Sequence, residues 1–172
     1  MTTNDLLKLC FWVLLVFAIG AMSACSNEPG LKTAVGDYTY RIAGTAHIYF
    51  QESGDDTAVP LTPESGTMTI VRGKEADRTT ATLYADDGNT YELPLYFTHD
   101  TVWIDEPVFR DIMVKVGGQD ELFHIRITGE GQILNNGDLN LHLGYSGRSR
   151  NTSHSWTLTA NPVNVHLNAK KK

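Results

Sequence analysis

Apolar and polar side chains alternate along most of this chain with a period of two residues. In residues 36–50 the apolar face consists of Tyr38, Tyr40, Ile42, Ala46, Ile48 and Phe50. The positions between them are mostly polar, among them Thr39, Arg41 and His47. Because successive side chains of a strand point to opposite faces of a sheet, this segment is predicted to be a long strand with one buried face.

The same alternation recurs in shorter segments that are separated by turn residues. These segments are residues 67–71, 79–85, 91–97, 101–104, 108–116, 123–133, 139–145 and 154–160, and 163–167 is a candidate continuation of the last one. Asp87-Gly88 is a hairpin signal between two of them. No long apolar pattern with a 3.6-residue period follows the first segment of the chain, so we expect helix to be nearly absent.

An all-β fold follows, with 8–10 sequential antiparallel strands in an up-and-down meander. Such a meander either closes into a small barrel, which removes its edges, or folds into a two-sheet β-sandwich. Gly44, Gly129 and Gly131 lie on the apolar faces of the longest strands, where a barrel needs kinks or close backbone approach. We therefore expect the barrel, with the sandwich as the alternative.

The first segment, residues 1–24, has the layout of a secretory signal peptide. A polar start with Lys8 precedes an apolar block over residues 9–19, and small residues follow it. A transmembrane helix is the alternative, but the apolar block has about half of the roughly 20 residues that span a bilayer. The signal peptide is therefore the preferred interpretation.

The tetrapeptide Met22-Ser23-Ala24-Cys25 resembles a bacterial lipobox. The resemblance implies that Cys25 is acylated, becomes the new N-terminus and anchors the protein to a membrane without spanning it. By similarity to Gram-negative lipoproteins, Ser26 implies the outer membrane, in a leaflet that the sequence leaves open. Residues 25–35 would then be the lipidated N-terminus and tether, 36–167 the β-barrel domain and 168–172 a basic tail.

The domain as a whole resembles the calycin-like, or lipocalin-like, small barrels of bacterial envelope lipoproteins. Its opening, Gly36-Asp37-Tyr38, is similar to the Gly-x-Trp start of lipocalins, with tyrosine in place of tryptophan. The resemblance implies a barrel that holds a small apolar ligand. The residues expected to line the cavity are Tyr38, Tyr40, Ala46, Gly129 and Gly131.

Charge and the arrangement of reactive residues exclude several classes of function. The chain carries 14 Lys and Arg against 20 Asp and Glu, a net charge of -6, so nucleic acid is not an expected partner. The segment Gly144-Tyr145-Ser146-Gly147-Arg148 lacks the final glycine of a nucleophile elbow. No spacing brings a nucleophile, a base and an orienting group together, or two histidines onto one metal. We therefore expect no catalytic site, no metal and no cofactor.

Acidic residues fall in the predicted connections between strands. Because the loops of a meander alternate between its two ends, the first, third, fifth and seventh connections are expected at the same end. These connections supply a predicted acidic rim of Asp55, Asp56, Asp86, Asp87, Asp105, Glu106 and Asp138. Such a rim suits Ca²⁺ or a cationic partner, and solubility is the simpler explanation.

A short motif in the same region is a candidate modification site. Asp56-Thr57-Ala58 resembles the Asp-Ser/Thr-apolar signal for O-glycosylation in some gut-associated envelope bacteria. Thr57 is expected in a long loop over residues 51–65, where an enzyme can reach it.

Two functions from different classes follow from these features. The first is a lipid-anchored binding module that holds a small apolar or amphipathic ligand in its barrel. The second is an interaction or structural lipoprotein, such as an enzyme inhibitor or accessory subunit, that binds a protein or glycan through its loops.

Overall fold

The computed structural model of the protein describes residues 30–172, which form eleven strands and two short helical segments. The strands are β1 (Gly36–Phe50), β2 (Asp55–Pro60), β3 (Glu64–Ile70), β4 (Arg78–Ala85), β5 (Thr90–Thr98), β6 (Thr101–Ile104), β7 (Val108–Val116), β8 (Gln119–Ile133), β9 (Leu139–Ser149), β10 (Trp156–Ala160) and β11 (Val165–Lys171). The helical segments are α2 (Leu31–Ala34) and the 3₁₀ turn η1 (Pro162–Asn164). Within these residues no helix has the length and apolar character needed to cross a membrane. The predicted signal peptide and Cys25 lie outside the described residues.

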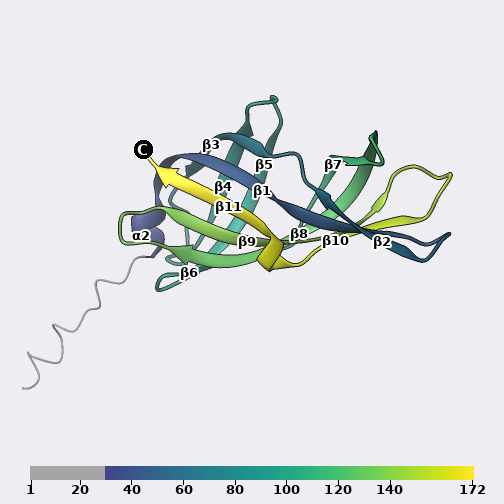
Figure 1. Cartoon of the computed structure of the whole chain (residues 1–172). Coiled ribbons are helices and arrows are strands. Elements are labelled where there is room, and N and C mark those ends of the chain that lie inside the picture. Colours follow the sequence, from purple (N-terminus) through teal and green to yellow (C-terminus); the bar gives the residue numbers. More distant parts are fainter. Residues whose placement is uncertain (1–29) are drawn as a thin grey trace, which may run out of the picture.

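The predicted all-β, antiparallel fold is confirmed, and its strands pair in a ring. The order around the ring is β1-β3-β4-β5-β6-β8-β9-β11, and β11 pairs with β1 to close it. β2, β7 and β10 lie outside this ring and extend the sheet beyond one of its ends (Figure 1). The molecule is therefore a small closed ring that continues into an open sheet, with β2 and β7 as the two edges of that sheet.

Three pairs of short strands behave as single long strands that are interrupted at a proline. On one side of β1, β2 and β3 pair with its two halves, and on the other side β10 and β11 do the same. Similarly, β6 and β7 pair with the two halves of β8. The three interruptions contain Pro63, Pro107 and Pro162. Because proline cannot donate a ladder hydrogen bond, the pairing stops there. Counted in this way, the eleven strands are eight consecutive segments of an up-and-down meander.

The first strand begins at residue 36, where the β-barrel domain was expected to start, and the end of the predicted tether is folded ahead of it. Residues 31–34 form α2, whose Leu31 and Ala34 are buried in the core at the closed end of the ring. The Tyr38 hydroxyl donates a 2.5 Å hydrogen bond to the Ala34 carbonyl oxygen. This contact fixes α2 to the beginning of β1.

Residues 168–172, which were expected to form a basic tail, belong largely to β11, since this strand continues to residue 171. Lys171 lies opposite Tyr38 in the pairing of β11 with β1. The Lys171 backbone N–H donates to Asp138, and its ammonium group donates to the Thr33 carbonyl oxygen at 2.5 Å. The last lysines are therefore part of the sheet at its closed end.

The inward faces of the strands form one hydrophobic cluster. The apolar positions of β1 from Tyr38 to Ile48 are buried as the alternation predicted, and Phe50 is partly buried at the end of the strand. Met68, Leu83 and Leu95 are fully buried from β3, β4 and β5. The interior of the ring is therefore lined by packed aliphatic and aromatic side chains up to its open end.

Candidate functional site

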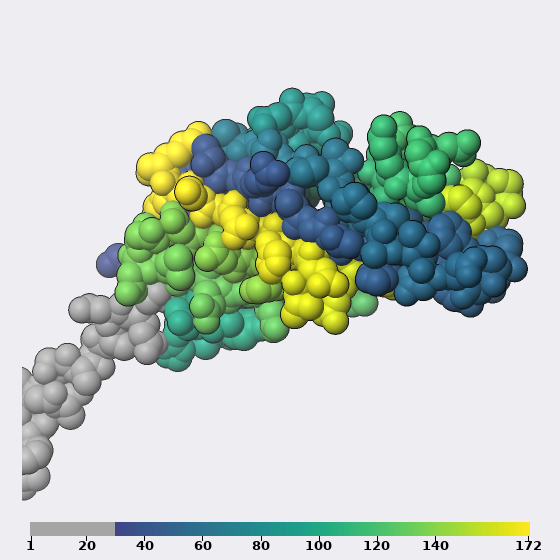
Figure 2. Space-filling view, in the orientation of Figure 1, coloured from purple at the N-terminus to yellow at the C-terminus, as the bar shows by residue number. Residues whose placement is uncertain are grey.

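A cleft lies where the ring opens into the extended sheet. It has a volume of about 620 Å³ and lies between the turn joining β4 to β5, the start of β3, and the hairpin of β7 and β8. Figure 2 shows the surface notched between the β4–β5 and β7–β8 hairpins, which are teal and green in that view. Its apolar side chains are Ile42, Leu61, Pro63, Ile112, Met113, Leu122 and the ring of Tyr145. The cleft therefore has large apolar walls as well as the polar groups described next.

Polar side chains from three strands, β1, β5 and β7, converge on Glu64, the first residue of β3, at the inner side of this cleft. One oxygen of the Glu64 carboxylate accepts hydrogen bonds from the hydroxyls of Tyr40 (2.8 Å) and Tyr91 (2.6 Å). The other oxygen lies 2.9 Å from a guanidinium nitrogen of Arg110, whose carbon lies 4.0 Å from the centre of the Tyr91 ring. Each group is thus held by at least one other, which fixes the geometry of the cluster.

Burial keeps the tyrosines of this cluster protonated. The pKa of Tyr91 is raised, first by burial and then by the nearby negative charge of Glu64. Burial also raises the pKa of Tyr40, and its hydrogen bond to Glu64 adds to that effect. Both hydroxyls therefore remain donors to the carboxylate at neutral pH.

Tyr145 on β9 contributes a hydroxyl that has no hydrogen-bond partner among residues 30–172. The residue is buried, with 8% of its surface exposed, and it lines the cleft. Its hydroxyl makes no hydrogen bond within residues 30–172. Every side-chain oxygen that is fully buried in this part of the chain has a partner, so the Tyr145 hydroxyl is not fully buried. The exposed part of Tyr145 therefore includes its hydroxyl, which reaches the cleft and is available to a ligand.

Sequence reasoning missed Arg110, although its position in the alternation carries a signal. Arg110 has the same phase as Val108, Ile112 and Val114, so it is a cation on an otherwise apolar face. A buried cation requires a buried anion. No feature of the sequence indicated that Glu64 supplies it from another strand.

The five residues predicted to line a cavity are not brought together at one site. Tyr40 reaches the cleft through Glu64, whereas Tyr38 points to Ala34 at the closed end of the ring. Ala46 is fully buried in the second half of β1. Gly129 and Gly131 on β8 lie directly against β9, where a side chain at position 131 would meet the backbone of that strand.

The predicted acidic rim is wrong as a single surface. β6 and β7 run in the same direction along one edge of β8, so Asp105 and Glu106 lie in an interruption and not in a reversal of the chain. Because one expected reversal is missing, each connection after residue 107 lies at the end of the molecule opposite to the predicted end. Asp138 is at the closed end, beside Lys171. Asp86 and Asp87 flank the cleft.

The long loop predicted over residues 51–65 contains β2, which pairs with the second half of β1. Asp55, Asp56 and Thr57 are therefore strand residues, because the chain reverses within residues 51–54. Thr57 is exposed on this edge strand, opposite Ile48. Asp56 makes a 3.2 Å contact with His47 across the pair of strands.

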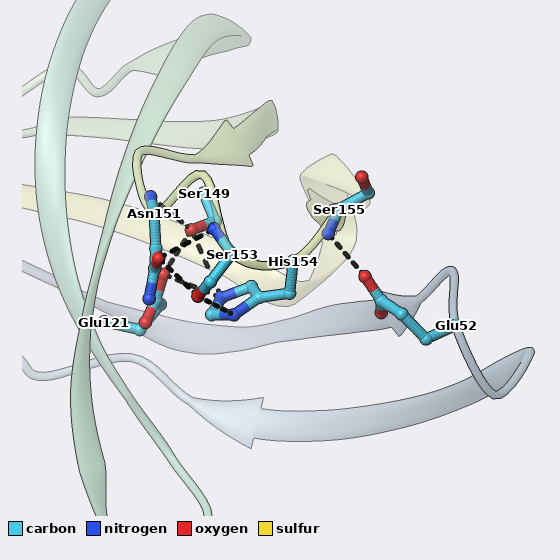
Figure 3. Close-up of polar contacts among 7 residues, drawn as sticks. All are labelled: Glu52, Glu121, Ser149, Asn151, Ser153, His154 and Ser155. Atoms are coloured by element: carbon cyan, nitrogen blue, oxygen red, sulfur yellow. Dashed lines mark hydrogen bonds and ion pairs between the residues drawn. The ribbon is translucent and has the colours of Figure 1, made fainter.

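A serine, histidine and glutamate cluster lies near the far end of the extended sheet (Figure 3). His154 Nε2 lies 3.1 Å from Glu121 and 3.5 Å from the Ser149 hydroxyl, which itself donates to Glu121. In a catalytic triad the hydroxyl and the acid contact different nitrogens of the histidine. The Ser153 hydroxyl near Nδ1 donates instead to Asn151 at 2.7 Å. The cluster therefore has the geometry of a loop anchor and not of a triad.

Metal ligands do not gather in the part of the chain that the structure describes. No group of three or more His, Cys, Asp or Glu side chains is placed there to hold an ion. His142 and His166 do meet, with ring centres 4.8 Å apart, on neighbouring strands.

Comparisons with protein-family models, with curated proteins and with solved structures find no match to this chain. The resemblance to calycin-like lipoproteins therefore stays a prediction from the sequence.

Proposed function

We propose that this protein is a lipid-anchored binding module of the cell envelope that holds a small amphipathic ligand in the cleft at the open end of the ring. The observation that carries the proposal is the Tyr145 hydroxyl, which belongs to a largely buried side chain, faces the cleft and has no partner among residues 30–172. Apolar walls with a few convergent polar groups are typical of small-molecule sites, and about 620 Å³ is within their usual range of volumes.

The position of the cleft suits a membrane anchor at Cys25. The described chain enters the fold through α2 at the closed end of the ring (Figure 1). The residues that line the cleft lie towards the other end. A lipid at Cys25, five residues before Gly30, would hold the closed end near the membrane. The cleft would then face away from the lipid surface, where a ligand can enter.

Native mass spectrometry of the full-length protein, purified from its own host without denaturation, tests this function. We expect a mass excess that disappears on unfolding. Tyr145→Phe should weaken rebinding of that ligand about three- to tenfold, the worth of one hydrogen bond. The matched control is Tyr84→Phe, at a tyrosine on β4 that is 48% exposed and outside the cleft. Equal losses in the two variants would contradict the proposal.

An interaction lipoprotein is the second candidate, because of the exposed edge strand β7. Phe109 on β7 is 61% exposed, and β7 pairs only with β8 in the described sheet. Unpaired edges and exposed aromatic residues are features of surfaces that bind other chains. A protein that carries no small molecule and takes up none would favour this candidate over the first.

A further inference from the structure

The charges that line the cleft do not balance. Among its lining residues, Glu64, Asp86, Asp87 and Asp111 are negative and Arg110 is positive. Glu64 and Arg110 form an ion pair. An excess of negative charge therefore remains at the mouth of the cleft.

Two of these carboxylates, Asp86 and Asp87, form no ion pair within the described residues, although the charge of Arg110 also acts on Asp87. Asp111 is paired with Arg150 (3.2 Å) and His124 (2.7 Å). Among residues 30–172, Asp86 accepts a hydrogen bond from the Ser65 hydroxyl, and Asp87 accepts from the backbone and side chain of Asn89. The hydrogen bonds from Asn89 hold the pKa of Asp87 below its usual value, so this carboxylate is ionised at neutral pH.

The opposite side of the cleft is apolar and partly open to solvent. Met113 on β7 is 53% exposed and Leu122 on β8 is 37% exposed, and both line the cleft with Ile112. The Tyr145 hydroxyl is a separate polar group within the same cleft. A ligand that satisfies all these groups has a positively charged head with N–H donors and an apolar chain.

We propose that the ligand of the cleft is an alkylammonium amphiphile. Its ammonium group binds between the carboxylates of Asp86 and Asp87 and donates to the Tyr145 hydroxyl, and its chain lies along Met113 and Leu122. The inference rests on the proposed function and adds the class of ligand to it. An anionic amphiphile of the same length would bring like charges together and be excluded.

Calorimetric titration of the full-length protein with three ten-carbon probes tests the charge of the ligand. We expect decan-1-amine to bind at least about tenfold more tightly than decan-1-ol, and decanoate to bind more weakly than the alcohol. The preference for the amine should decrease between 10 and 500 mM salt, since exposed charges are screened. Equal affinities, or a preference for decanoate, would overturn this inference and leave the proposed function standing. A failure of all three probes to bind would overturn both.

Substitution of Asp86 and Asp87 tests whether these carboxylates cause the preference for the amine over the alcohol. Asp86→Asn with Asp87→Asn should reduce the ratio of amine to alcohol affinity to near one. The matched control, Asp55→Asn with Asp56→Asn, removes the same charge from β2, away from the cleft. That control should keep the preference, and its loss in both double variants would assign the effect to net charge instead of to the cleft.

Discussion

Arg110 is a cation on an apolar face, and its environment explains how it is tolerated there. Its side chain is 16% exposed, and that of its partner Glu64 is 18% exposed. Two tyrosine hydroxyls occupy the other oxygen of Glu64, so the carboxylate has few free positions for water. Removal of either charge would leave the other poorly solvated and unpaired.

Arg110→Met should therefore lower the free energy of unfolding by about 3–5 kcal/mol. The control is Arg78→Met. Arg78 also lies over a tyrosine ring and pairs with acids, at 3.5 and 3.6 Å, but its side chain is 51% exposed. That substitution should cost less than about 1 kcal/mol. Urea denaturation measures both, and comparable losses would contradict the account of the cluster. The double variant Glu64→Gln with Arg110→Met should recover most of the loss, because no unpaired charge remains.

Tyr38 gives a second prediction, which concerns the stability of the protein at alkaline pH. Burial and then the charge of Asp138 raise the pKa of Tyr38 to about 12. The unfolded chain releases this proton near pH 10, so the folded state binds the proton more tightly. The resulting stability is present below about pH 10 and is lost as the pH rises towards 12.

Tyr38→Phe should accordingly reduce the fall of stability between pH 10 and 12 by about 1.4 kcal/mol per pH unit. At pH 7 the same variant should lose about 1 kcal/mol, because the Ala34 carbonyl oxygen loses its hydrogen bond. Urea denaturation across this pH range provides the measurement. An unchanged alkaline slope in the variant would show that Tyr38 does not titrate in this window.

Individual residues were predictable where one face of a strand decides their environment. The alternation in residues 36–50 placed Tyr38, Tyr40 and Ile48 in the core, and all three are buried. The partners of polar groups were not predictable in this way. The contact of Glu64 with Tyr91 joins residues 27 positions apart, and it depends on how the ring closes.

At the scale of elements, the strands were predictable and their connections were not. The segment 101–104 coincides with β6, and 108–116 coincides with β7. The chain between them was expected to reverse, but Pro107 interrupts one long strand instead. A proline between two apolar segments is compatible with a turn and with an interruption, and the pattern of pairing decides between them.

Close approach of β8 and β9 gives a prediction for Gly131. An added methyl group at this position would meet the backbone of Asn140 and Leu141 on β9. Gly131→Ala should therefore destabilise the protein by about 1–3 kcal/mol, the usual cost of overpacking. The control is Gly144→Ala on β9, where the nearest atoms lie 3.0–3.5 Å away in the side chains of Thr128 and Pro162, a milder contact than the backbone overlap at position 131. Thermal unfolding compares the two, and a larger loss for Gly144→Ala would contradict this assignment.

At the scale of the whole molecule, the two ends of the ring have different roles. α2 and the last residues of β11 close one end, through Tyr38, Lys171 and their partners. The other end opens into a sheet whose edges, β2 and β7, are not hydrogen-bonded to each other. The closed ring was predictable from the meander. The cleft was not, because it lies where β4 and β5 end and the interrupted long strands on either side of them, β2–β3 and β6–β7, continue.

Two methionines report on the two places where a ligand could bind. Met68 is fully buried inside the ring on β3, and Met113 is in the wall of the cleft on β7. In the full-length protein with ¹³C-labelled methionine methyl groups, titration with decan-1-ol should shift the Met113 signal and leave the Met68 signal in place. Met113→Leu assigns the signal. A shift of Met68 without a shift of Met113 would place the ligand inside the ring and contradict the assignment of the cleft as the binding site.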